Sequence, residues 1–494
     1  MKILAKLEKS LDCWFLIIIS VVFFFLRFPS LFEPNWYGDE GIYQTLGLAM
    51  NAGRLLYKGI FDNKPPLLYF LYSLVSSDEF SIRFMSLLFG ILAIITFFYL
   101  SKKLFKNQKS SYISTSIFAI LFGLPLIEGN IANAENFMLF PNILAGLLVF
   151  KSLGQKNLSL KYKTLFLAGI VIGISFLFKI VALFDFAAFF GFVFFASFTK
   201  KILDIFKLEN IIAEIKNLLP ITIGFVSPIL LIALIFILNG AFSDLLKATF
   251  FSNIDYISYG NKFIIPQGFL ILKLVLLSVF CLFVFYKRKS FGLPFTFISL
   301  WLAFSLFNAY FSQRPYTHYV LVLIPSFCLM IGLFAANKNF SRISGVLVLL
   351  SFIAVLLSFN FYVQTIFYYQ NFISFIIGAK SVTSYQNFFD KNTPRDYKIA
   401  EYINSNIGEE NNLFIWGNNA QIYDLTNKLP PGKYTVAYHI TSYKDGLSNT
   451  QEGLDKSKPK IIVIMPNVPS FPFSLSNYYQ KINISGAEIY ERFY

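Results

Sequence analysis

Hydrophobic residues occur along most of this chain in long runs that are separated by short polar connections. Each run is about 20 residues long, which is the length at which an α-helix crosses the hydrocarbon core of a bilayer. We predict about eleven such helices, at residues 14–33, 81–100, 111–127, 137–152, 164–179, 180–198, 219–239, 266–286, 291–310, 318–336 and 343–365. The fifth and sixth are the least clearly separated, because only Lys179 interrupts the run that they share.

Lys and Arg are concentrated in alternate connections between these runs, which is the orientation signal of membrane proteins. The six basic clusters are Lys2/Lys6/Lys9, Lys102/Lys103/Lys106/Lys109, Lys151/Lys156/Lys161/Lys163, Lys200/Lys201/Lys207/Lys216, Lys287/Arg288/Lys289 and Lys338/Arg342. With eleven spans, all six lie on one side of the membrane, and that side is predicted to be cytoplasmic. The sequence thus predicts a multi-pass plasma (inner) membrane protein with a cytoplasmic N-terminus.

The connections on the opposite side carry acidic and aromatic residues instead. They are about 34–80 (with Asp39, Glu40, Asp62, Asp78 and Glu79), about 128–136 (with Glu128 and Glu135), about 240–265 (with Asp244, Asp255, Tyr256 and Tyr259) and Gln313 to Tyr319. The groups that can do chemistry are therefore expected on the extracytoplasmic face.

The pattern changes after residue 365, where polar helical segments alternate with short β-rich runs. We predict helices at 397–407 and about 419–428, and strands at 413–416, 434–438 and 461–465. The predicted fold is thus an α-helical polytopic membrane domain over residues 1–365, followed by a small extracytoplasmic α/β domain over residues 366–494.

Composition supports the membrane assignment and excludes several classes of protein. Hydrophobic residues make up 56% of the 494 and charged residues 14%, whereas a soluble domain has roughly 25% charged residues. The net charge of +15 lies largely in the short connections, so no nucleic-acid partner is predicted. Three cysteines and two histidines are too few for a disulfide scaffold or a Cys/His zinc site.

The first acidic connection contains adjacent carboxylates, Asp39 and Glu40. Such groups can act as a general base or bind a cation, but acidic residues are also favoured at helix N-termini by capping and by the dipole. Lys64 has a similar ambiguity. It is either a cation for a lipid phosphate or an interfacial anchor before the helix start at Pro65 and Pro66.

Further charged groups map to the same face of the membrane: Glu135, Lys179, Arg314 and His318. Glu135 also fits a helix cap, and Arg314 and His318 fit membrane anchoring. Carboxylates and cations together suit transfer from a phosphate-linked donor. A carboxylate can accept the proton of the acceptor hydroxyl, and cationic side chains can hold the leaving phosphate. The chain has no Gly-rich phosphate loop, which argues against a nucleotide-powered pump.

These residues resemble the motifs of the GT-C membrane glycosyltransferases, in particular the bacterial and archaeal, protein mannosyltransferase-like branch of family 39 and the related aminoarabinose transferases. The matching pieces are Tyr37-Gly38-Asp39-Glu40 with Tyr43, Asp62 to Leu67 with Arg83, Asn133 to Asn136 around Glu135, Arg314 to Tyr319 leading into Leu323-Ile324-Pro325, and Phe414 to Gly417 with Ile422-Tyr423. They extend over nearly the whole chain.

The resemblance implies an inverting transfer of a sugar, mannose-like or similar, from a polyprenyl-phosphate carrier to a hydroxyl of a protein, lipid or glycan. It implies Asp39 as the catalytic base and Glu40 as its support or a cation ligand. The implied substrate-binding residues are Tyr43, Lys64, Arg83, Glu135, Arg314 and His318. Lys179 is a further candidate from its position, because an ionisable group at the outer end of two tightly joined spans is a functional hypothesis by default. A divalent cation, with Asp39, Glu40 and Glu135 as candidate ligands, is the one cofactor suggested. Asn63 stands where aminoarabinose transferases have an acid, which weakens the case for metal there.

Two other functions use the same lipid substrates. A transporter or flippase of lipid-linked sugars also needs many spans, but it is expected to show internal repeats and polar, broken helices at mid-membrane. A polysaccharide polymerase or ligase shares the lipid substrate, but that function would not lead us to expect the Asp-Glu motif or the extracytoplasmic domain. We therefore expect a membrane glycosyltransferase.

Overall fold

The computed structural model describes residues 2–76, 78–153, 160–198, 204, 207–254, 268–311, 314, 316–336, 342–359, 361–408 and 412–493. Several residues used in the sequence analysis lie outside this part of the chain: Lys156, Lys200, Lys201, Asp255, Tyr256, Tyr259, Gln313, Pro315 and Lys338.

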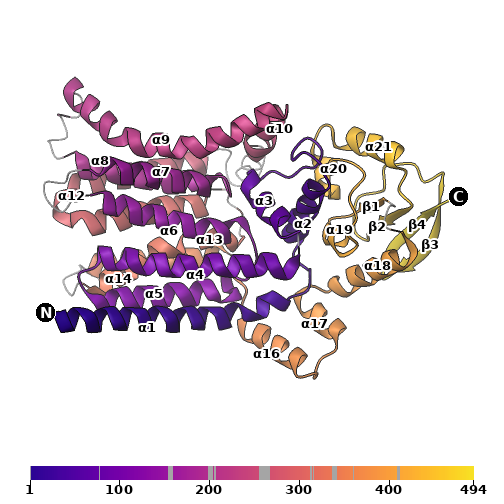
Figure 1. The fold of residues 1–494 in the computed structure, drawn as a ribbon, viewed down its shortest axis with the longest axis horizontal. Coiled ribbons are helices and arrows are strands. Elements are labelled where there is room, and N and C mark those ends of the chain that lie inside the picture. Colours follow the sequence, from indigo (N-terminus) through magenta and orange to yellow (C-terminus); the bar gives the residue numbers. More distant parts are fainter. Residues whose placement is uncertain are drawn as a thin grey trace.

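Long helices run side by side as a bundle that makes up most of the molecule (Figure 1). They are α1 (Lys2–Arg27), α4 (Glu79–Leu104), α5 (Gln108–Gly123), α6 (Ala134–Ser152), α7 (Tyr162–Phe176), α8 (Ala182–Ser197), α9 (Leu208–Leu238), α12 (Gly268–Ala309), α14 (Ile324–Ala336) and α15 (Arg342–Ser358). The described part of each predicted span lies largely in helix, and many large apolar side chains are exposed, as lipid contact requires.

Four described segments are long and apolar enough to cross a membrane: Ser10–Phe32, Glu79–Leu104, Leu208–Leu238 and Leu270–Ala309. The last contains two of the predicted spans and a break in the helix at Gly292, where φ is +75°. Glycine adopts this conformation without the steric cost that other residues have. The number of spans stays a prediction, because several of the other helices are shorter.

Short helices cover one end of the bundle, and the C-terminal residues lie beyond them (Figure 1). We call this the domain-facing end. The short helices are η1 (Phe28–Phe32), α2 (Gly38–Asn51), α3 (Pro66–Leu74), η2 (Pro125–Ile127), α10 (Phe242–Leu246), η4 (Lys247–Phe251) and α13 (His318–Leu321). The predicted last span ends early, at Ser358, and α16 (Thr365–Ile376) then begins at the predicted domain boundary.

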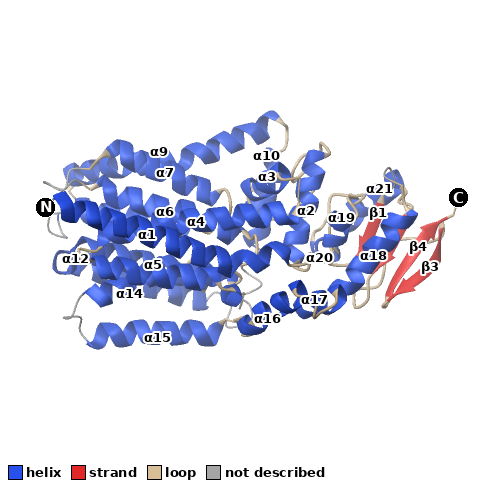
Figure 2. Ribbon diagram, turned by 60° about the horizontal axis from the view of Figure 1, so that its bottom comes forward, coloured by secondary structure: helices blue, strands red, loops and turns tan. Residues whose placement is uncertain are grey.

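The C-terminal domain combines a four-stranded sheet with helices (Figure 2). The strand order is β1-β2-β4-β3, in which β1 (Leu413–Trp416) and β2 (Ile461–Ile464) are parallel and β4 (Ala487–Arg492) runs antiparallel to β2 and β3 (Tyr478–Ile484). The helices are α17 (Val382–Phe389), α18 (Thr393–Asn406), α19 (Gln421–Leu425), α20 (Ala437–Ser442) and α21 (Gly446–Ser457).

One predicted strand is wrong. Tyr434 forms only a single bridge, to Phe61, and Ala437 starts helix α20. The β-rich composition at 434–438 reflects burial against the membrane domain rather than a place in the sheet, and β propensity measures fit to a half-buried surface more than backbone preference. The predicted helix at 419–428 is also shorter, since α19 covers Gln421–Leu425.

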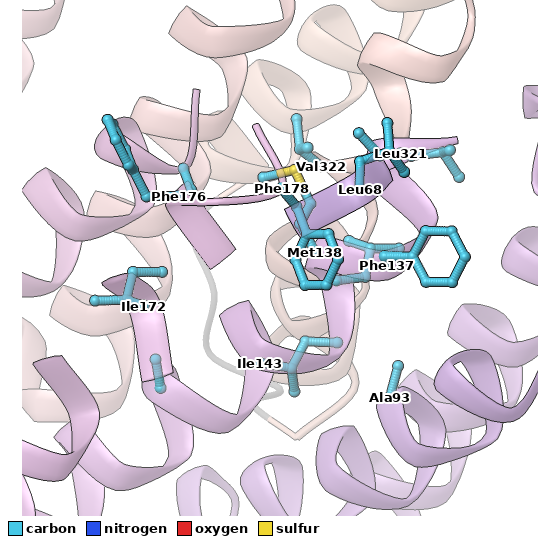
Figure 3. Packing of buried hydrophobic residues seen from close by; sticks show 14 of the residues in the cluster. Leu68, Ala93, Phe137, Met138, Ile143, Ile172, Phe176, Phe178, Leu321 and Val322 are labelled. Atoms are coloured by element: carbon cyan, nitrogen blue, oxygen red, sulfur yellow. The ribbon is translucent and has the colours of Figure 1, made fainter. Parts of the chain in front are cut away.

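The hydrophobic core continues from the bundle into the C-terminal domain, where Trp416 and Val436 belong to the same cluster of buried residues. At the domain-facing end, Leu68 of α3 and Leu321 of α13 lie with Phe137 and Met138 of α6 (Figure 3). The elements that carry the candidate site residues therefore share one packed core, and close packing restricts their relative movement.

Candidate active site

Asp39 lies in the first turn of α2, at the domain-facing end of the bundle. Its side chain is 38% exposed, and its carboxylate lies 3.5 Å from the Lys64 ammonium. The hydroxyl of Tyr43, one helical turn later, donates a hydrogen bond of 3.0 Å to Asp39. Protein groups thus hold one side of the carboxylate, and part of its surface stays exposed.

The charges around Asp39 keep it ionised. Burial by itself would raise the pKa of Asp39, but Lys64, His318 and Lys179, together with the hydrogen bond from Tyr43, outweigh it and lower the pKa below its usual value. A carboxylate in this state can accept a proton at neutral pH.

The loop before α3 holds Lys64 in place. The backbone N–H of Lys64 donates to the Tyr69 hydroxyl at 3.1 Å, and its carbonyl accepts from the Tyr57 hydroxyl at 2.6 Å. Its ammonium lies 3.7 Å from Asp62 and 4.8 Å from the centre of the Tyr43 ring. Because Pro66 starts α3, the lysine ends up on a short, well-fixed turn beside Asp39.

A second group of charges faces the same region. Lys179, in the connection between α7 and α8, pairs with Glu135 in the first turn of α6. Nε2 of His318, the first residue of α13, lies 3.9 Å from Glu135. Burial raises the pKa of Glu135, but Lys179 and His318 more than compensate, so the pKa is lowered overall. The Leu67 N–H donates to the Leu177 carbonyl at 3.1 Å, which joins the Lys64 turn to the Lys179 turn.

Glu128 belongs to this group, although the sequence indicated it only as an acid of the same connection. It accepts hydrogen bonds from the hydroxyls of Tyr37, at 2.6 Å, and Thr317. Its carboxylate also lies 2.9 Å from Nδ1 of His318. The backbone of Glu128 is in the left-handed region, with φ of +59°, a conformation that residues other than glycine rarely adopt. No local pattern in the sequence indicates that Glu128 contacts Tyr37, Thr317 and His318.

Glu40 and Arg83 pair with each other in the interior. Glu40 is 2% exposed, and one of its oxygens lies 2.7 Å from the Arg83 guanidinium, which is fully buried. Arg83 also pairs with Glu79 at 2.8 Å, and Glu40 accepts from the backbone N–H of Ala132 at 2.8 Å. Neither side chain is open to a substrate. They hold α2 against α4, and the catalytic role of Glu40 and the substrate-binding role of Arg83 stay predictions.

The predicted cation site is also not formed by its candidate ligands. Glu40 faces Arg83 and Glu135 faces Lys179, so the two do not converge with Asp39. Within the described ranges, no three His, Cys, Asp or Glu side chains are grouped to hold a metal ion. These carboxylates are arranged as partners of cationic side chains instead.

Arg314 lies in the connection between α12 and α13, four residues before His318. Tyr316, from the same connection, stacks on the His318 ring with centroids 5.6 Å apart. The connection thus reaches the second group of charges through Tyr316 and His318.

The C-terminal domain reaches the site through His439 of α20. Nε2 of His439 lies 3.8 Å from Asp62, the carboxylate next to Lys64. The ring is 3% exposed, and burial lowers the pKa of His439 to about 4 despite the opposing effect of Asp62, so the ring is neutral at pH 7. The sequence analysis missed this residue, because nothing near it in the chain indicates contact with a loop almost 380 residues earlier.

Comparison with known proteins gives matches at the level of family and fold. Residues 63–212 match the family model of the dolichyl-phosphate-mannose-protein mannosyltransferases. ArnT from Cupriavidus metallidurans, solved bound to undecaprenyl phosphate, is similar over 96% of this chain and 97% of that chain, with 12% identity and a TM-score of 0.54. A search of curated protein sequences gives no match.

Two archaeal structures are similar at a lower level. One is the oligosaccharyltransferase AglB from Archaeoglobus fulgidus in complex with an inhibitory peptide and a dolichol-phosphate. The alignment covers 93% of the present chain and 70% of the AglB chain, with 12% identity and a TM-score of 0.49. A structure of the oligosaccharyltransferase from the same organism with Zn and sulfate covers 91% and 68%, with 14% identity and a TM-score of 0.48. The full-length similarity to ArnT shows that the chain has the GT-C fold.

Proposed function

We propose that this chain, a GT-C-fold membrane glycosyltransferase related to the aminoarabinose transferases, transfers a mannose-like hexose or similar sugar from a polyprenyl-phosphate carrier to an acceptor hydroxyl. The observation that carries the proposal is the half-exposed Asp39 carboxylate 3.5 Å from Lys64. Lys179, from the connection between α7 and α8, and His318, from α13, act on the same carboxylate. A base and several cations at one end of a membrane bundle fit a hydroxyl attacking a phosphate-linked sugar.

In the proposed step, the acceptor oxygen forms a bond to the anomeric carbon while the bond from that carbon to the phosphate oxygen breaks. The hydroxyl proton moves to Asp39, and the electron pair of the broken bond leaves with polyprenyl phosphate. Attack from the face opposite the phosphate inverts the anomeric configuration. Because a phosphate monoester is a good leaving group, one carboxylate base is enough.

Lys64 links donor binding to the strength of this base. The Lys64 ammonium lies against Asp39 and Asp62. A donor phosphate competes for the same ammonium, and an opposite charge within about 4–6 Å favours the ionised carboxylate. Once the phosphate neutralises Lys64, the pKa of Asp39 rises and Asp39 becomes a better base. The enzyme would thus activate the acceptor only when the donor is in place.

Several features support the phosphate-binding side of the proposal. Lys179 and His318 lie beside Glu135, and Tyr43 orients Asp39. Arg314 lies in the connection that carries His318. ArnT was solved with undecaprenyl phosphate, which supports a polyprenyl-phosphate donor here. The acceptor is a hydroxyl of a protein, lipid or glycan.

The proposed site faces the extracytoplasmic side of the plasma (inner) membrane. Lys102 and Lys103 end α4, and Lys151 lies in the last turn of α6, whereas both helices begin at the domain-facing end. Basic residues favour the cytoplasmic side, so their location supports an extracytoplasmic C-terminal domain. In this scheme residues 1–365 form the catalytic membrane domain, and residues 366–494 form a second domain at the end of the bundle that carries the site.

The function is tested by incubating the purified, reconstituted chain with a panel of polyprenyl-phosphate sugars and a hydroxyl acceptor. We expect release of free polyprenyl phosphate together with a product of inverted anomeric configuration. Translocation of a lipid-linked sugar across the bilayer without release would favour a flippase. Release with retained configuration would reject the direct displacement by the acceptor.

A further inference from the structure

An open cavity of about 650 Å³ lies where α17, α18 and the β3–β4 hairpin meet, away from Asp39 and its partners. Its cationic lining residues are Lys391, Arg395 and Lys398, and its polar lining includes Ser384, Asn387 and Ser485. Among the described residues that line it, none is acidic. Cations with hydroxyl and amide groups around one hollow suit an anionic oxygen ligand such as a phosphate.

Arg395 is held in a fixed position within this lining. Its Nε and Nη2 donate to Asp396 at 3.0 and 2.9 Å, and Nη1 donates to Asn392 at 3.2 Å. Asp396 is buried and also accepts from Asn419 and Gln421. Little conformational entropy is therefore lost when the guanidinium meets a ligand, whereas Lys391 and Lys398 are exposed and adaptable.

An exposed apolar surface precedes the cavity in the chain, and its last residue, Val382, lies between the lining residues Ser381 and Thr383. On α16 and the turn after it, Ile366 is 80% exposed and Ile377 71% exposed, and Val382 follows at the start of α17. The opposite side of α16 packs inwards through Phe372, whose ring lies 5.9 Å from Phe32 of η1. We call the outward side the α16 apolar surface; it consists of Val363, Ile366, Phe367, Ile373, Ile376, Ile377 and Val382.

This surface continues the side of the bundle that is expected to face lipid. Figure 2 shows α15, α16, α17 and α18 in succession along one side of the molecule, from the bundle to the sheet. Phe32 is itself partly exposed and contacts the exposed Phe80 at the start of α4. A helix with one apolar side at the end of a membrane bundle is suited to lie in the bilayer interface.

We propose that the cavity binds the anionic headgroup of a membrane phospholipid whose acyl chains lie along the α16 apolar surface, so that the C-terminal domain is docked on the bilayer. An amphipathic occupant accounts for both observations, since the cavity is cationic and the adjoining helix side is apolar. The inference goes beyond the proposed glycosyl transfer and does not depend on it, because its test measures lipid binding alone.

The test titrates the full chain in non-ionic detergent with phosphatidylglycerol or phosphatidylcholine and counts bound lipids by native mass spectrometry. We expect the wild type to prefer phosphatidylglycerol. The double variant Lys391→Gln/Lys398→Gln should bind it about 10- to 30-fold more weakly, as expected for two basic residues near anionic lipid. Arg395 is left unchanged, because its loss would remove the cationic partner of buried Asp396. A matched control is Lys444→Gln/Lys456→Gln, which alters two exposed lysines elsewhere in the domain and should keep the wild-type preference.

Two further measurements distinguish a lipid headgroup from free inorganic phosphate as the ligand of the cavity. Ile373→Asp/Ile377→Asp should weaken phosphatidylglycerol binding while leaving the response of the melting temperature to inorganic phosphate as in the wild type. If inorganic phosphate alone stabilises the wild type as much as the lipid does, the cavity is a free-anion site and the docking proposal fails. The proposal also fails if Lys391→Gln/Lys398→Gln, with a wild-type melting temperature, keeps the preference for phosphatidylglycerol.

Discussion

Adjacent residues at the start of α2 serve different purposes because of the geometry of a helix. Successive positions differ by about 100° around the axis, so Asp39 and Glu40 cannot face the same region. Asp39 points to Lys64 and is partly exposed, whereas Glu40 points inwards to Arg83. The two carboxylates are therefore not interchangeable, and each predicts its own mutant phenotype.

At the residue scale, the first prediction concerns the proposed base. Asp39→Asn keeps the size of the side chain and its hydrogen-bond partner Tyr43 but removes the proton acceptor. We expect the variant to fold and bind donor, and to turn over at most about 1% as fast as the wild type, since loss of a general base costs on the order of 100- to 10,000-fold. The control is Asp78→Asn, at the exposed N-cap of α4, which should keep its rate. A wild-type rate for Asp39→Asn would leave Asp39 as a helix-start residue.

The second prediction at this scale concerns donor affinity. Lys64→Ala removes one charge-assisted phosphate contact, which contributes roughly 1.5–3 kcal/mol. The apparent donor affinity should drop by about 10- to 100-fold in an equilibrium binding assay with polyprenyl phosphate. Lys58→Ala, an exposed lysine of the same loop, is the matched control and should bind like the wild type. Unchanged binding by Lys64→Ala would make Lys64 an interfacial anchor only.

At the scale of elements, the Glu40–Arg83 pair fastens α2 to α4. Both side chains are buried, and Arg83 also bonds to the carbonyl oxygen of Glu33 at 2.7 Å. Removing one partner of a buried ion pair typically costs about 3–5 kcal/mol, and Glu79, which still pairs with Arg83, offsets part of that loss. Glu40→Gln should therefore lower the melting temperature of the solubilised chain clearly.

The half-exposed pair of Lys102 with Asp12, at the other end of α4, is the comparison for this effect. Lys102→Gln should change stability by less than about 1 kcal/mol, because solvent screens such pairs. Equal melting temperatures for Glu40→Gln and Lys102→Gln would contradict the anchoring role. If Glu40→Gln is as stable as the wild type but inactive, Glu40 takes part in the chemistry after all.

The contact between α20 and the Lys64 loop predicts a pH dependence. Burial lowers the pKa of His439 to about 4, whereas an unfolded histidine has a pKa of about 6.5. Between these values the unfolded chain binds a proton that the folded chain does not, so stability falls as the pH falls from about 6.5 towards 4. At pH 5 the loss is about 2 kcal/mol.

This effect is isolated by comparing the wild type with His439→Gln, because other groups titrate in both proteins. The difference in melting temperature between the two should shift in favour of the variant as the pH is lowered from 7 to 5. A constant difference over this range would show that His439 titrates at its usual pKa in the folded protein, and a shift in favour of the wild type would show that its pKa is raised.

At the scale of the whole molecule, the end of the bundle that carries the site also carries the C-terminal domain. The candidate site and the C-terminal domain therefore lie on the same side of the membrane, whichever orientation the chain has. Reporter fusions to the full chain after about residue 400, and in the connection after α4, should give extracytoplasmic and cytoplasmic signals respectively, because the basic clusters lie at the opposite end. A cytoplasmic signal near residue 400 would move the proposed catalytic face to the cytoplasm.

The sequence alone was enough to predict most helices of the bundle and to select the segments that carry the candidate site residues. Hydrophobic runs of about 20 residues predict helix because the backbone must satisfy its own hydrogen bonds in lipid. The presence of an α/β domain after residue 365 was predicted as well. The β3–β4 hairpin was not, because most side chains of β3 are exposed or half-exposed and polar, and they lack the apolar alternation that marks a half-buried strand.

Only the tertiary structure decided which of the candidate side chains meet. Asp39 and Lys64 come together because α2 and α3 fold back over the bundle, while Glu40 and Arg83 are joined inside it. His439 lies almost 380 residues from its partner Asp62 in the chain. Capping, hydropathy and turn preferences act over a few residues, so they specify where an element begins and which residue types it carries. Contacts between distant segments depend on how all the elements pack at once, and no single segment of the sequence contains that information.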